Sequence, residues 1–201
     1  MHAGAPTGTA RSIARNAVGV MAVVLVLCAC TATPPSPLPS SSEVPAASAT
    51  PTPRLISPPE RPAAMDVPGA DGAAAAATHF LDLYEYSYGS LDSTAFAAMS
   101  SPECVFCRSV IDDVAEMELN NHTTTGGDYT VINSFGTEIS PQQWYSAAVQ
   151  LDQTPSAEID SIGRVLSETD GGRFQMVLAL DWDQSWLVRE VDVTPLPSAT
   201  P

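Results

Sequence analysis

Residues 163–193, GRVLSETDGGRFQMVLALDWDQSWLVREVDV, decide the fold class. Apolar and polar residues alternate along much of this stretch, which predicts strands over 163–168, 173–182 and 186–193. The sequence TDGG at 169–172 is a strong hairpin signal between the first two strands. We therefore expect the C-terminal part of the chain to form an antiparallel meander.

Two further strands are predicted upstream, after the glycine pair at 126–127. Residues 129–135 alternate with a period of two, which is typical of a strand. Residues 144–151 are ambiguous, because SPQQ at 140–143 matches a helical capping box while the following residues alternate. We interpret 144–151 as a strand.

Helices are predicted over the first part of the domain, at 73–88, 93–99 and 102–119. Asp71 is a candidate N-cap for the first helix, and the Ser-Pro pair at 101–102 is a typical start for the third. Helices followed by a meander predict an α+β fold over 71–193, with three helices packed on one face of a curved antiparallel sheet.

The N-terminus has the pattern of an export signal. Arg11 and Arg15 precede an apolar run of eleven residues, 17–27. That length suits the core of a signal peptide and is too short for a spanning helix of ~20 residues. Residues 1–29 are therefore predicted to be a signal peptide.

The sequence LCAC at 27–30 resembles the lipobox of bacterial lipoproteins. The resemblance implies cleavage before Cys30 and a lipid, carrying acyl chains such as palmitate, on its sulfur. Two acyl chains hold a protein at a membrane, whereas a single chain binds only marginally. The alternatives are an uncleaved signal anchor and a secretory signal that is cut near Ala32. The lipobox predicts a lipid-anchored protein on the extracytoplasmic side of the cell membrane.

Residues 30–70 are predicted to be a lipidated N-terminus followed by a disordered linker. Residues 31–70 hold 11 of the 18 prolines, with many Ser, Thr and Ala residues between them. Such a sequence buries too little apolar surface to fold, and it would reach ~120 Å as a polyproline helix. Residues 194–201 are predicted to be a disordered tail.

The charge of the domain is strongly negative. Beyond residue 70 the chain has 20 acidic residues, 4 arginines and no lysine, a balance of −16. Such a field repels phosphate backbones and anionic membrane surfaces, so nucleic acid is excluded as a partner.

Cys104 and Cys107 remain after the predicted cleavage. An even pair in an exported chain predicts a structural disulfide. A thiol oxidoreductase is the alternative, because a helix N-terminus lowers the pKa of a thiol, but thioredoxin-type sites need a strand leading into the motif. Zinc would need His79 and His122 as further ligands, and an oxidising compartment disfavours it, so no metal or other cofactor is predicted.

The segment SPECVFC at 101–107, with His-Phe at 79–80 and Trp-Leu-Val at 186–188, resembles an uncharacterised lipoprotein domain family of actinobacteria, a domain of unknown function. This resemblance covers 71–193. The order of elements is similar to the cone-shaped NTF2-like superfamily, a likeness of fold that implies no function.

The sequence contains no recognisable catalytic constellation, and no catalytic or cofactor-binding residue is assigned. Asp82 and Tyr84 could point into a cone-shaped pocket, as acids and tyrosines do in NTF2-like enzymes. The leading hypothesis is a non-catalytic binding or interaction module of the cell envelope, whose partner is an envelope protein or a small ligand. The alternatives are a small-molecule enzyme with a pocket under the sheet and a thiol-redox protein. A pocket with two converging ionisable side chains would favour the enzyme, and a filled cone would favour the module.

Overall fold

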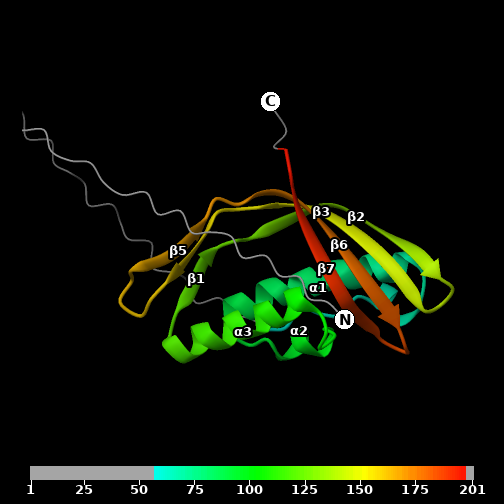
Figure 1. The fold of residues 1–201 in the computed structure, drawn as a ribbon, viewed down its shortest axis with the longest axis horizontal. Coiled ribbons are helices and arrows are strands. Elements are labelled where there is room, and N and C mark those ends of the chain that lie inside the picture. The colour runs from blue at the N-terminus through cyan, green and yellow to red at the C-terminus, as the bar shows by residue number, and fades with distance from the viewer. Residues whose placement is uncertain (1–56, 198–201) are drawn as a thin grey trace, which may run out of the picture. The chain divides into compact units, whose positions relative to one another are not determined.

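Three helices lie against one face of a curved antiparallel sheet in the computed structural model, which describes residues 57–197 (Figure 1). The short 3-10 helix η1, Ala63–Asp66, precedes α1, Ala70–Ser90, α2, Thr94–Ala98, and α3, Val105–Asn120. This arrangement confirms the predicted α+β fold class. The predicted signal peptide, Cys30, the first part of the linker and the last four residues lie outside the described residues.

Seven strands follow the helices in the described part of the chain: β1 Thr123–Gly126, β2 Tyr129–Ser140, β3 Trp144–Gln153, β4 Ser156–Ile159, β5 Val165–Thr169, β6 Gly172–Trp182 and β7 Trp186–Leu196. The larger sheet has the order β2-β3-β6-β7, and the smaller one has the order β1-β4-β5. The chain passes directly from β1 to β2, from β3 to β4 and from β5 to β6. The smaller sheet, which we call the arm, therefore continues three strands of the larger sheet beyond a bend.

The hairpin predicted at 169–172 is wrong. β5 pairs with β4 and β6 pairs with β3, so the chain keeps its direction through these residues. Gly171 and Gly172 have φ angles of 71° and 141°, and they bend the strand instead of reversing it. The reversal lies between β4 and β5, where the Asp160 carboxylate accepts the N–H groups of Ile162 and Arg164.

The strand prediction for 144–151 is correct, and the helical alternative is wrong. Along β3 the side chains of Tyr145, Ala147, Val149 and Leu151 are buried, as expected for alternate residues facing the helices. The short strands β1 and β4 escaped prediction because neither contains the alternating apolar pattern of a half-buried strand.

The core fills the space between α1, α3 and the concave face of the larger sheet. Small side chains let α1 approach β2 closely: Ala73, Ala76 and Ala77 are fully buried. The Ser134 hydroxyl of β2 donates to the carbonyl of Ala74 in α1. A Cβ added to Gly136 of β2 would lie 2.1 Å from the Ala70 carbonyl oxygen.

The folded part begins before the predicted boundary at residue 71. Met65, placed in the linker by prediction, is 2% exposed, and its carbonyl accepts the indole N–H of Trp186 at 3.1 Å. Gly69, and not Asp71, occupies the N-cap position of α1. Asp71 lies in the first turn, where a negative charge favours the helix dipole.

The tail predicted from residue 194 also starts too early. β7 pairs with β6 as far as Leu196, which lies opposite Arg173.

Within residues 57–197, no helix is long and apolar enough to cross a membrane.

Candidate ligand pocket

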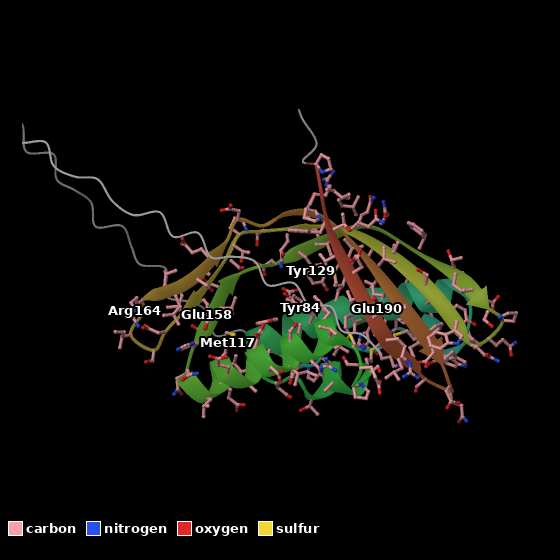
Figure 2. The ribbon with its side chains drawn as sticks, in the orientation of Figure 1. Tyr84, Met117, Tyr129, Glu158, Arg164 and Glu190 are labelled. Carbon is pink, nitrogen blue, oxygen red and sulfur yellow. A yellow bond between two sulfur atoms is a disulfide. The ribbon has the colours of Figure 1, made fainter. Side chains whose placement is uncertain are left out.

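A pocket of about 90 Å³ lies between the helices and the concave face of the sheet, next to the bend. It is lined by Leu81 and Tyr84 of α1, Phe106 of α3, Tyr129 of β2, Leu151 and Gln153 of β3, Phe174 and Met176 of β6, and Val193 of β7. Tyr84 and Tyr129 lie on the helical side and the sheet side of this region (Figure 2). The lining is apolar apart from Gln153 and the two phenol groups.

Local sequence patterns place these side chains. Leu81 and Tyr84 are three residues apart, so they share one face of α1. Phe174 and Met176 are two residues apart on β6 and both face the helices. The ring of Tyr84 stacks on that of Phe106 with centroids 6.0 Å apart, so α1 and α3 together form an aromatic wall.

The tyrosine hydroxyls near the pocket act as hydrogen-bond donors. Tyr129 donates to the Asp82 carboxylate at 2.6 Å, and Tyr88 donates to Asp113 at 3.3 Å. Burial raises the pKa of Tyr129, and the bond to Asp82 raises it further. Burial also raises the pKa of Tyr84, and the negative charge of Asp113 raises it further. These phenols therefore stay protonated at neutral pH.

Two carboxylates lie near the pocket and beneath the arm. Asp113 and Glu158 both lie close enough to Tyr88 to raise its pKa, after burial as the main cause. Glu158 of β4 also contacts the His122 ring, with 2.7 Å between Oε1 and Nδ1. Figure 2 shows Glu158 on the arm with Met117 of α3 below it.

The five arginines of the described residues bind elsewhere. Their partners are Asp66 for Arg61, the Pro102 carbonyl for Arg108, Asp160 for Arg164, Asp152 for Arg173 and Asp181 for Arg189. None of them is part of the pocket lining. No arginine of residues 57–197 pairs with Asp82, Asp113 or Glu158, so these carboxylates keep negative charge near the pocket.

The chemistry of the pocket lining is that of apolar groups, one amide and two phenols. The ionisable side chains of the lining are tyrosines, and a phenol with a raised pKa is a poor general base at neutral pH. Within residues 57–197, no three His, Cys, Asp or Glu side chains cluster as metal ligands would. The pocket offers an apolar cavity with carboxylate acceptors near it, since the O–H groups of Tyr129 and Tyr88 already donate to Asp82 and Asp113.

Of the predicted pocket residues, Tyr84 lines the cavity and Asp82 binds the Tyr129 hydroxyl beside it. Sequence reasoning missed Phe106, Phe174 and Met176 as lining residues. Alternation along 173–182 fits inward positions for Phe174 and Met176, but nothing local distinguishes a cavity wall from a filled core. Trp186 belongs to the core: it is 3% exposed and packs edge-on against Tyr145 at 4.8 Å.

His79 lies outside the pocket lining, and its buried Nδ1 has no hydrogen-bond partner among residues 57–197. Burial lowers the pKa of His79; Asp82 acts against this effect, and Arg61 adds to it. The unfolded chain therefore binds a proton more readily than the folded protein does.

We expect the free energy of unfolding to fall as the pH drops below about 6.5, the usual pKa of histidine. The slope contributed by His79 is at most ~1.4 kcal/mol per pH unit, because one proton is taken up on unfolding. Urea titrations between pH 7.5 and 5 should show this loss of unfolding free energy in the wild type. In His79→Leu the unfolding free energy should depend less steeply on pH. An equal slope in both proteins would contradict the assignment.

Cys104 and Cys107 lie at disulfide distance, with 5.2 Å between their Cα atoms. The pair does not occupy the first turn of a helix starting at 102, as predicted, because α3 starts at Val105 with Cys104 as its N-cap. The Cys107 N–H donates to the Cys104 sulfur at 3.2 Å. Both residues are at most 1% exposed, so a redox partner has no access to the sulfur atoms.

The double variant Cys104→Ala/Cys107→Ala is expected to fold with a moderate loss of stability. The loop closed by this pair is very short, so the bond contributes less than the ~3 kcal/mol of a 15-residue loop. Urea unfolding measures the loss. Alkylation of the wild type in denaturant, followed by intact-mass analysis, should find neither thiol modified, and two modified thiols would contradict a disulfide.

No family model matches the sequence, and no curated protein sequence matches it. Among solved structures, the chain is similar to an uncharacterised protein with a cystatin-like fold from Caulobacter vibrioides. The identity is 14% and the TM-score 0.41, over 62% of this chain and 90% of that one. It is also similar to the intermembrane space region of the chloroplast protein ARC6. There the identity is 13% and the TM-score 0.39, over 61% of this chain and 97% of that one.

Proposed function

We propose that this protein is a lipid-anchored binding module on the extracytoplasmic side of the membrane, and that its pocket holds an apolar group of a ligand. The observation that carries the proposal is the lining: apolar and aromatic side chains surround a preformed cavity with polar groups at its margin. Pockets that bind small ligands have this composition. Its volume of about 90 Å³ suits one small apolar group.

The anchor and the tether complete the proposal. The lipobox-like sequence ending at Cys30 supports attachment to the membrane, and the proline-rich residues that follow supply reach. The resemblance of SPECVFC at 101–107 to an actinobacterial lipoprotein domain family belongs to the same proposal. A thiol-redox function is disfavoured, because both sulfur atoms are buried.

Binding in the pocket can be tested with indole, a small neutral aromatic probe, added to the mature protein in mild detergent. We expect saturable shifts of the methyl NMR signals of Leu81, Leu151 and Met176, which line the cavity. Val193 is 40% exposed at the edge of the pocket, so Val193→Phe should block entry and abolish the shifts.

Val165→Phe is the matched control. Val165 is also an exposed valine on a strand, 48% exposed on β5, and it is not part of the pocket lining. This variant should bind indole as the wild type does. Indole binding that leaves the three methyl signals unmoved, or that Val193→Phe does not affect, would refute the pocket as the binding site.

A further inference from the structure

We propose that the ligand is an extended peptide that adds as a strand to the free edge of β7 and inserts one apolar side chain into the pocket. This inference rests on the proposed function and names the class of partner. Three observations carry it: an open backbone edge, a pocket directly beside that edge, and negative charge on both sides of it.

The edge of β7 is closed at its start and open beyond it. Near the start, the Ser101 N–H donates to the Val188 carbonyl, and the Val188 N–H donates to the Met99 carbonyl, both at 2.8 Å. Beyond Val188, β7 is the last strand of the larger sheet, with only β6 beside it in the described part of the chain. α3 lies close to β7 near α2 and diverges from it toward the C-terminal half of the strand (Figure 1).

The register shows which backbone groups point outward. Pro195 lies opposite Phe174 and has no N–H, so it fits only where no bond to β6 is required. Backbone groups alternate along a strand, so Val191 and Val193 share the orientation of Pro195 and direct their N–H and C=O groups to the open edge. An added strand can use these groups, as in other cases of strand addition.

Val193 links the edge to the pocket. Its side chain lines the cavity, while its backbone belongs to the open edge. A residue on an added strand opposite Val193 would have its Cβ about 4.5–5.5 Å from that of Val193, on the same face of the sheet. An apolar side chain at that position enters the cavity beside Phe106.

Charge selects which peptides bind. Glu190 and Asp192 lie on β7 itself, where Figure 2 labels Glu190, and Asp113 lies on α3. Lysine or arginine beside the apolar residue would meet these carboxylates, whereas acidic peptides and phosphate-bearing ligands would be repelled. A small cationic amphiphile fits the charge and the cavity but would leave the backbone groups of the edge unused.

The probes are ten-residue peptides with an acetylated N-terminus and an amidated C-terminus. Thr and Val alternate around a central Leu, and either Lys or Glu occupies the two positions beside that Leu. The mature protein in mild detergent should bind the Lys peptides with Kd below ~1 mM, more weakly at higher salt, and it should not bind the Glu peptides. Hydrogen exchange should slow at the amides of Val191 and Val193 when the Lys peptide is bound.

Val193→Pro removes the outward N–H and should weaken binding of the Lys peptide at least 10-fold. Val193→Ala shortens the side chain but keeps the N–H, and it should weaken binding clearly less than the proline variant does. Val165→Pro places the same change on another exposed strand and should leave binding unchanged. Where Val193→Pro does not fold, hydrogen exchange in the wild type decides alone.

Absence of peptide binding below ~1 mM, or unchanged exchange at Val191 and Val193 in the complex, would overturn the inference. If indole fills the pocket while the peptides fail, the proposed function stands and the peptide class is wrong. If both fail, the pocket is not a binding site. Binding of dodecyltrimethylammonium without protection of the β7 amides would identify the ligand as a small cation and also overturn the inference.

Discussion

Gly126→Ala is expected to destabilise the protein by ~3 kcal/mol or more, because it places a side chain where two strands touch at the bend. Gly126 ends β1 with a φ of 70°, a conformation that disfavours alanine by roughly 1–2 kcal/mol. A Cβ there would lie 2.1 Å from the carbonyl oxygen of Pro155, a backbone atom that cannot rotate away. Overpacking of this kind adds typically ~1–3 kcal/mol.

Gly163→Ala is the matched control. Gly163 has a φ of 85°, but within the described part of the chain no heavy atom lies within 4 Å of the position that its Cβ would take. Only the strain of the positive φ remains, so the expected loss of unfolding free energy is roughly 1–2 kcal/mol. Urea unfolding of the full-length variants compares the two free energies directly, and equal losses would mean that the bend tolerates a side chain at Gly126.

The same bend explains why sequence reasoning misplaced the hairpin. A Gly pair between two strands supplies positive φ both to a reversal and to a bend, so TDGG at 169–172, read as a hairpin signal, is also compatible with a bend. The strand pairing decides between them: β5 pairs with β4 and β6 pairs with β3, so β5 and β6 do not pair with each other. A Cβ on Gly171 would lie 2.5 Å from the Gln153 carbonyl, a contact made across strands and absent from any local pattern.

The helices and the cysteine pair were predictable because their determinants are local. Apolar residues at helical spacing predict α1 and α3, and two cysteines three residues apart can bond within one turn. The pocket is different, because its lining comes from six elements and depends on where α3 diverges from β7. Tyr129 is an example. Alternation predicts its strand, but its hydrogen bond to Asp82 joins residues 47 positions apart, and no local pattern predicts it.

Cys30→Ala is expected to abolish both maturation and membrane attachment. In the lipobox reading, the sulfur of Cys30 carries the diacylglyceryl group, and cleavage before residue 30 requires that modification. Each buried CH₂ contributes ~0.8 kcal/mol, so losing the acyl chains removes the anchoring free energy. Detergent phase separation should find the wild type in the detergent phase, and intact-mass analysis should find the variant without lipid and with residues 1–29 attached.

Cys28→Ala is the control, because Cys28 lies at the second position before the cleavage site, where alanine is a small residue as well. That variant should mature and partition like the wild type. A Cys30→Ala protein that is still cut and still enters the detergent phase would exclude the lipid anchor and favour a plain secretory signal cut near Ala32. The domain would then be released from the membrane, and the proline-rich residues that precede it would have no surface from which to extend.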